Sequence, residues 1–158
     1  MSQFEKYHPL LTPHYAFDWL TKNRVIDVFN LYQSIKEPAI TMETTAALVN
    51  DTMRAIFSDQ QLVWGVTDKA TDDFVGQVGF TSLNLDQHAA TVKIAVVAAY
   101  HRSEPLTEIL QRLISFGTLE LKLQHLTVTI PVMDKLVEQV LTGLNFTTTD
   151  HLTFNFQQ

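Results

Sequence analysis

The chain contains no cysteine among its 158 residues, which excludes disulfide bonds, cysteine-ligated zinc and thiol nucleophiles. Its longest uncharged apolar run, Ile94 to Tyr100, is far too short to cross a bilayer. It has no block of Lys or Arg and a formal net charge of −6, so the basic footprint of a nucleic-acid-binding protein is missing. The N-terminal residues show no charged segment followed by an apolar stretch. We therefore expect a cytoplasmic protein with neither a membrane nor a nucleic-acid partner.

The remaining composition is that of a folded protein. Hydrophobic residues make up 46% of the chain, and a chain of this length can bury a substantial core. Because the sequence has no repeat, linker or low-complexity tract, we expect a single domain over residues 1–158. The six histidines show no H-x-x-x-H or H-E-x-x-H spacing, so a metal site has no support.

Hydrophobic periodicity predicts a mixed order of strands and helices. A period of two indicates strands, and a period of 3.6 indicates amphipathic helices. Thr21 is the expected N-cap of the first helix. The expected strands cover 15–20, 62–67, 74–81, 91–97, 125–130, 145–149 and 151–156, and the expected helices cover 21–32, 41–58, 105–121 and 133–142. This order predicts an α+β domain built on one sheet.

The stretch from Ala90 to Leu121 organises the chain. A buried strand at 91–97 is followed by a short loop at 98–104 and by a long helix that opens at Pro105. Unpaired backbone N–H groups and the positive end of the helix dipole meet where such a helix begins. The loop is therefore a candidate anion site.

Several strings resemble the GNAT N-acetyltransferase superfamily, and in particular its branch of ribosomal-protein N-terminal acetyltransferases. The resemblance runs from about Tyr15 onward and rests on residues 63–66, 68–71 and 74–80, which look like the family's second and third strands. Residues 113–130 look like its third helix and fifth strand. The resemblance implies an α+β fold with a GNAT-like mixed central sheet, helices on both faces and central strands that splay apart.

The resemblance also implies transfer of an acetyl group from acetyl-CoA to a primary amine, by direct attack of the amine on the thioester. The pantetheine arm would lie between the strand at 91–97 and the strand at Leu126. Backbone groups near Val96 and Val97 would hydrogen-bond the arm, and an N–H there would stabilise the oxyanion. The pyrophosphate would lie on the loop before Pro105.

That loop departs from the family pattern Arg/Gln-x-x-Gly-x-Gly/Ala. Glu104 brings a carboxylate to the phosphate position, Pro105 lacks a backbone donor, and Leu106 is found where Gly or Ala is expected, whereas Arg102 could bind the phosphate. Two interpretations stay open: weakened binding of acetyl-CoA, or capping of the helix by Ser103 or Glu104 with no phosphate bound. The cofactor contacts that the resemblance implies are Val96, Val97, His101, Arg102, Ser103, Glu104, Leu106, Thr107 and Asp134.

The family's proton-transfer positions have unsuitable residues in this chain. Its carboxylate early in the central strand falls at Thr91, and its protic positions on the fourth helix fall at Val137 and Leu141. Tyr100, His88 and His101 could in principle move protons, although a surface histidine and a packed aromatic ring are the simpler explanations. Of these, Tyr100 and His101 are the expected catalytic residues. Family position alone suggests the substrate contacts Asp18, Trp19 and Tyr32.

We therefore expect an acetyl-CoA-dependent N-acetyltransferase that acts on a protein N-terminus or on a small-molecule amine. The alternative is a catalytically impaired GNAT-like protein that binds a small molecule or a protein partner through the same cleft. The altered loop favours the alternative, and the intact strand framework favours the enzyme. The sequence leaves the acceptor and the oligomeric state open, a homodimer included.

Overall fold

The computed structural model of the protein describes residues 3–35 and 39–158. In chain order, its elements are β1 (Leu10–Leu11), β2 (Tyr15–Asp18), the 3₁₀ helix η1 (Leu20–Lys22), α1 (Val25–Ile35), α2 (Met42–Phe57), β3 (Leu62–Asp68), β4 (Phe74–Asn84), β5 (Ala89–Val96), the 3₁₀ helix η2 (Ala98–Tyr100), α3 (Ser103–Leu119), β6 (His125–Thr129), α4 (Lys135–Gly143), β7 (Thr147–Thr148) and β8 (Thr153–Gln157). Within these residues, no helix has the length and apolar character that crossing a membrane requires.

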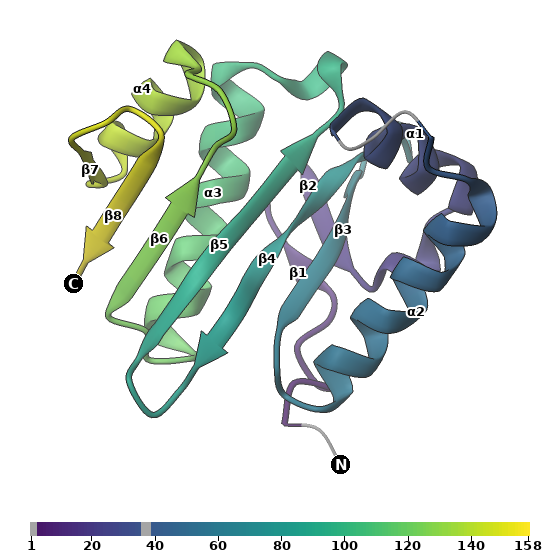
Figure 1. Ribbon diagram of the computed structural model, residues 1–158, viewed down its shortest axis with the longest axis horizontal. Helices are drawn as coiled ribbons and strands as arrows, with labels where there is room; N and C mark the ends of the chain where they lie inside the picture. Colours follow the sequence, from purple (N-terminus) through teal and green to yellow (C-terminus); the bar gives the residue numbers. More distant parts are fainter. Residues whose placement is uncertain (1–2, 36–38) are drawn as a thin grey trace.

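The strands form one mixed sheet in the order β1-β2-β3-β4-β5-β6-β8-β7. Strands β5 and β6 run parallel, and the other neighbouring strands are antiparallel. Helix α3 lies on one face of the sheet, and α1 and α2 lie on the other (Figure 1). This architecture confirms the expected fold class. The two-residue strand β1 was not predicted, because it is too short to show a period.

The main core fills the space between the sheet and α3. Trp64 of β3 is fully buried and meets Phe116 of α3, with ring centroids 5.4 Å apart. Gly117 allows α3 to approach the sheet closely, because a Cβ there would lie 2.7 Å from the ring of Phe80. A smaller core lies on the side of α1 and α2 and includes Tyr32. Burial of these large side chains is the main force that holds the helices on the sheet.

The first helix begins later than its periodicity suggests. Thr21, the expected N-cap, lies in η1, and α1 begins at Val25. Between them, the side chain of Asn23 packs over β3 at Gly65, where a Cβ would lie 2.1 Å from the amide oxygen of Asn23. This contact joins residues far apart in the chain, so the local pattern does not reveal it.

Strands β5 and β6 part in the middle of the sheet. Their register pairs run from Ala89↔His125 to Thr91↔Thr127. Beyond that point β5 continues to Val96, whereas β6 stays paired with β8 as far as Thr129. The expected splay of the central strands is therefore confirmed. We call the unpaired lengths, residues 92–96 of β5 and 128–129 of β6, the slot.

Candidate functional site

Backbone groups at the carboxyl end of β5 differ in their availability. The N–H of Val97 donates to the carbonyl of Val75 on β4 (2.8 Å), and the carbonyl of Val97 accepts from Tyr100 (3.0 Å). Both polar groups of Val97 are thus engaged, which argues against its expected backbone contact with a cofactor. Because successive residues of a strand turn their N–H groups to opposite sides, the N–H of Val96 points toward the slot. Val96 is therefore the better candidate for a backbone donor.

The loop after β5 turns two adjacent side chains in opposite directions. The hydroxyl of Tyr100 donates to Oδ2 of Asp68, at the end of β3, over 2.8 Å. The Nε2 atom of His101 lies 2.8 Å from Oδ2 of Asp134, just before α4. The two residues expected to move protons therefore lie on different sides of the loop.

Electrostatics distinguishes the roles that Tyr100 can take. Burial and then the hydrogen bond to Asp68 raise the pKa of Tyr100 above its ordinary value. The same hydrogen bond, together with the N–H of Ala70, lowers the pKa of Asp68. At neutral pH the pair is consequently a protonated phenol and a carboxylate, so Tyr100 is suited to donate a proton and not to accept one.

Tyr100 also lines a pocket of about 620 Å³, which lies between the start of α1, the β3–β4 turn and the residues after β5. Arg24 and Asp27 in its wall are joined by two hydrogen bonds of 3.0 and 3.2 Å. Such a polar cavity suits a hydrophilic ligand. The charged residues that line the pocket are Lys22, Arg24, Asp27, Asp72 and Asp73. None of them was predicted as a site residue, although the polar turn at 68–73 could have indicated the two aspartates.

A second pocket of about 460 Å³ shares part of this wall and reaches Asp18, one of the expected substrate residues. Asp18 accepts a hydrogen bond from the N–H of Trp19 (2.8 Å) and lies 2.9 Å from Nδ1 of His8. Trp19 itself is buried against the ring of His8, and Tyr32 is buried in the smaller core. The structure thus brings Asp18 to a pocket and puts the other two in packed surroundings.

Helix α3 begins earlier than expected. Arg102 is its N-cap, and no side chain forms a cap hydrogen bond, so the prediction that Ser103 or Glu104 caps this helix is wrong. Both residues lie inside the first turn because the helix starts at Ser103. Pro105 is tolerated at the third position, since the first N–H groups of a helix have no intrahelical partner. Glu104 is exposed in this turn, where its carboxylate competes with an anion for the helix dipole.

The other residues expected to contact the pyrophosphate differ in accessibility. The guanidinium of Arg102 is exposed, donates to a carbonyl of its own loop (3.1 Å) and lies 5.9 Å from the ring of Tyr100. Ser103 and Thr107 border a pocket of about 140 Å³ shared with α4. Leu106 is buried in the main core, so its side chain does not reach this surface.

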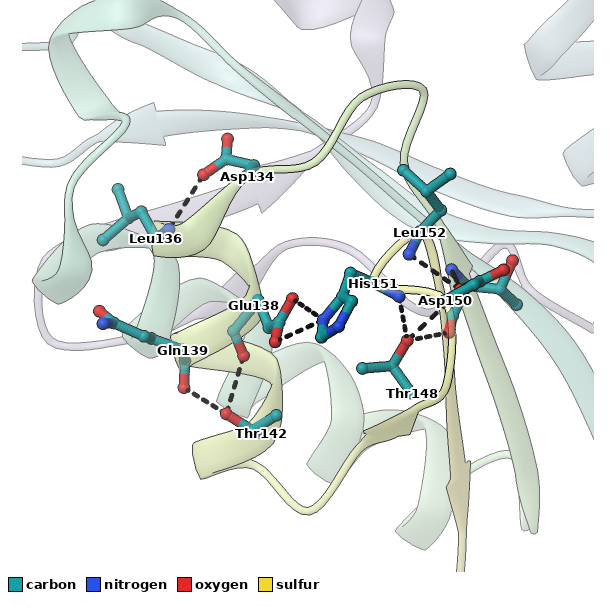
Figure 2. A network of polar contacts seen from close by, with 10 residues as sticks. Asp134, Leu136, Glu138, Gln139, Thr142, Thr148, Asp150, His151 and Leu152 are labelled. Atoms are coloured by element: carbon teal, nitrogen blue, oxygen red, sulfur yellow. Dashed lines mark hydrogen bonds and ion pairs between the residues drawn. The ribbon is translucent and has the colours of Figure 1, made fainter.

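Asp134 is the N-cap of α4. Its Oδ1 atom accepts hydrogen bonds from the N–H groups of Leu136 (3.0 Å) and Val137 (3.2 Å), and Figure 2 shows the carboxylate at the start of this helix. The other carboxylate oxygen meets His101. Asp134 therefore satisfies helix donors and also joins α4 to the loop that follows β5.

The site fits the parts of acetyl-CoA unequally. The unpaired backbone of the slot, with the N–H of Val96, matches the amide groups of a pantetheine arm. At the start of α3, a diphosphate would meet the carboxylate of Glu104 and would lack the N–H that Pro105 does not have. Arg102 offers one compensating positive charge. The slot therefore offers backbone groups to such an arm, and the start of α3 offers one cation and one carboxylate to an anion.

Comparisons with known proteins agree with this fold. Spermidine N-acetyltransferase from Vibrio cholerae, in complex with CoA and spermine, is 13% identical with a TM-score of 0.78, covering 93% of this chain and 97% of that chain. Ribosomal-protein-S5-alanine acetyltransferase from Vibrio fischeri is 13% identical with a TM-score of 0.75, covering 95% of both chains. At these identities the similarity is one of fold. No curated protein sequence matches the chain. A family model described as an acetyltransferase (GNAT) domain matches residues 9–147, so the protein belongs to the GNAT acetyltransferase family.

Proposed function

We propose that the protein is an N-acetyltransferase that moves the acetyl group of acetyl-CoA to a primary amine. The observation behind this proposal is the parting of β5 from β6, with a polar pocket at the residues that follow β5, in a chain of the GNAT family. The slot would hold the pantetheine arm, and the pocket would hold the amine. Because Tyr100 lies in the pocket wall on the loop that follows β5, donor and acceptor would meet near the end of this strand.

The reaction follows from direct attack. The acceptor nitrogen forms a bond to the thioester carbonyl carbon, the carbon–sulfur bond breaks, and the thiolate of CoA leaves. We assign the N–H of Val96 to the carbonyl oxygen, where negative charge develops. The acceptor ammonium loses one proton to water before the attack, and the nitrogen loses a second proton once it is bonded to carbon. Tyr100 gives its proton to the leaving thiolate and takes one back from water, which restores the phenol. No covalent enzyme intermediate is required, in keeping with a chain that has no cysteine.

The acceptor is a protein N-terminus or a small-molecule amine. The neighbours of similar fold include proteins named for a ribosomal-protein alanine and for spermidine. The pocket contains carboxylates that attract an ammonium group and also the cations Lys22 and Arg24, which offer partners to carbonyl groups. A panel of short peptides, polyamines and amino sugars therefore decides the acceptor class.

The alternative is a protein that binds a ligand in the same cleft without acetyl transfer. Glu104 and Pro105 at the start of α3 favour it, as do the aprotic Val137 and Leu141 on α4. Such a protein would bind the arm of acetyl-CoA or another ligand but would release no thiol.

Calorimetric titration with acetyl-CoA, followed by a thiol-release assay with the acceptor panel, tests the proposal. We expect saturable heat and a release of CoA that depends on the acceptor. Heat without thiol release would favour the alternative. Neither heat nor a thermal shift at millimolar acetyl-CoA would refute the acetyltransferase proposal.

Replacing Arg102 with alanine is expected to weaken acetyl-CoA binding about tenfold. A charge-assisted hydrogen bond to phosphate contributes roughly 1.5–3 kcal/mol, and exposure of the guanidinium reduces that figure. Arg54→Ala is the matched control, because Arg54 is an exposed cation on α2 that pairs with Asp51. An unchanged dissociation constant for Arg102→Ala would rule out Arg102 as the phosphate partner.

Three further expectations stay predictions: the single-domain organisation of residues 1–158, the homodimer and the cytoplasmic location. Sedimentation velocity of the purified protein checks the homodimer through its mass. A second copy of the chain is thus proposed as a partner, beside acetyl-CoA and the amine.

A further inference from the structure

The two sides of the slot meet again beyond the point where the strands have parted. Strand β5 leads through η2 to His101, and strand β6 leads through residues 130–133 to Asp134. The ring nitrogen Nε2 of His101 and Oδ2 of Asp134 are 2.8 Å apart. Strand pairing bounds the slot at Thr91↔Thr127, and this side-chain contact joins the two segments at the other end.

The contact can open without loss of the helix cap. Asp134 uses Oδ1 for the N–H groups of Leu136 and Val137, and Oδ2 for His101. The side chains of His101 and Asp134 are 40% and 29% exposed, so water can take the place of each partner. A polar contact in this setting contributes little to folding, and its rupture leaves no buried unpaired charge.

A second contact of the same chemical type joins α4 to the turn between β7 and β8. Nδ1 of His151, from the turn between β7 and β8, lies 2.9 and 3.0 Å from the two carboxylate oxygens of Glu138 (Figure 2). Helix α4 therefore stays attached to its own strands when His101 moves away. The contact between His101 and Asp134 is not needed to fix the helix.

The segment that leads to Asp134 has unusual exposure. Val132 and Met133 are 69% and 67% exposed, although large apolar side chains are stabilised by removal from water. They directly precede Asp134 in the chain. A thioester arm in the slot would give these side chains an apolar surface to cover.

We propose that His101 and Asp134 form a clasp over the end of the slot, which the pantetheine arm of the donor must displace on entry. The inference rests on the proposed function, because it takes the slot as the site of the arm. On this proposal, His101 and Asp134 control the access of the cofactor to the slot. Their contact would account for part of the weak acetyl-CoA affinity that is expected of this chain.

Two substitutions test the clasp by calorimetry with CoA. Asp134→Asn removes the charge and keeps an oxygen that can cap α4, and His101→Ala removes the contact altogether. We expect each to lower the dissociation constant of CoA about two- to fivefold, the range that exposed pairs of this kind provide. Glu138→Gln is the matched control: it weakens the other histidine contact on α4 and leaves the dissociation constant unchanged.

A double substitution separates the clasp from independent effects. Because the two side chains act on each other, His101→Ala with Asp134→Asn should bind CoA no more tightly than His101→Ala alone. In parallel, the imidazole NMR signals of His101 should shift on CoA binding to the unsubstituted protein, and those of His151 should not. This measurement does not depend on the folding of any variant.

The outcomes distinguish the clasp from the proposed function. Weaker CoA binding by His101→Ala would make His101 a ligand of the cofactor and would overturn the clasp. Unchanged binding by both variants would overturn it as well, while the acetyltransferase proposal survives. Failure of the unsubstituted protein and of every variant to bind CoA would refute both proposals. Binding by the variants alone would support the clasp in its strongest form.

Discussion

Replacing Trp64 with alanine is expected to lower the free energy of unfolding by about 3–5 kcal/mol. The indole is fully buried, meets Phe116 edge to face and donates from Nε1 to the carbonyl of Tyr7 over 2.8 Å. Alanine would leave a cavity between β3 and α3 and would also remove the donor for that carbonyl. Because single domains are stable by roughly 5–15 kcal/mol, this loss is a large share of the total. Urea unfolding followed by circular dichroism measures it.

Phenylalanine at the same position separates packing from hydrogen bonding. Trp64→Phe keeps much of the apolar contact with Phe116 and removes the indole N–H, so we expect a loss of about 1–2 kcal/mol. The difference between the two variants is then the contribution of the ring. A loss within about 1 kcal/mol for Trp64→Ala, the average for any substitution, would contradict the central position of Trp64 in the core.

Replacing Tyr100 with phenylalanine is expected to reduce kcat about a hundredfold, the lower end of what a positioned general acid contributes. The hydroxyl that would protonate the leaving thiolate is lost, while the backbone of the slot is untouched. The dissociation constant of acetyl-CoA should therefore stay the same. Steady-state thiol release and calorimetry on the same preparation measure the two quantities.

The pH profile gives an independent check on Tyr100. Its raised pKa lies above the ordinary value of 10.0, so the proton needed for donation is present at neutral pH and is lost only above pH 10. Activity of the unsubstituted protein should accordingly not fall between neutral pH and that value through loss of this proton. A decline through ionisation of Tyr100 near neutral pH would contradict its assignment as the acid.

Tyr15 supplies the matched control for Tyr100. Its ring lies edge to face with that of Tyr100, with centroids 6.2 Å apart, and the hydrogen bond to Asp68 does not involve it. Tyr15→Phe therefore removes a neighbouring hydroxyl and should leave kcat close to that of the unsubstituted protein. Equal kcat values for the Tyr15 and Tyr100 variants would show that the phenol of Tyr100 is not the proton donor.

The elements that the sequence predicted well are those specified by local signals. Helix α2 was expected over 41–58 and covers Met42–Phe57, because Thr41 caps it by accepting from the N–H of Thr44 and its apolar side chains recur at helical spacing. Strand β3 was also indicated locally, since Leu62 to Val66 form a short continuous run of buried residues, as expected of a strand covered on both faces. Local periodicity also indicated the strand–loop–helix unit around β5.

The features that escaped prediction depend on contacts between distant residues. Before the start of α1, Asn23 packs over Gly65 of β3, and the contact of His101 with Asp134 joins the segments that follow two different strands. The pocket beside Tyr100 likewise combines α1 with the β3–β4 turn. No short stretch of the sequence contains both partners of such a contact. The sequence therefore shows the residues but does not show that they contact each other.

The divided sheet has a mechanical consequence. Strands β6, β8 and β7 form a leaf of the sheet that pairs with β5 through the short ladder ending at Thr91↔Thr127, which would be the pivot of any tilt between them. From Thr91 to Val96 the chain extends about 16 Å, at about 3.3 Å per residue. A tilt of the leaf by about 5° at the pivot would therefore widen the far end by about 1.4 Å. A small rotation about the ladder would thus produce a larger displacement between β5 and β6 at the far end of the slot.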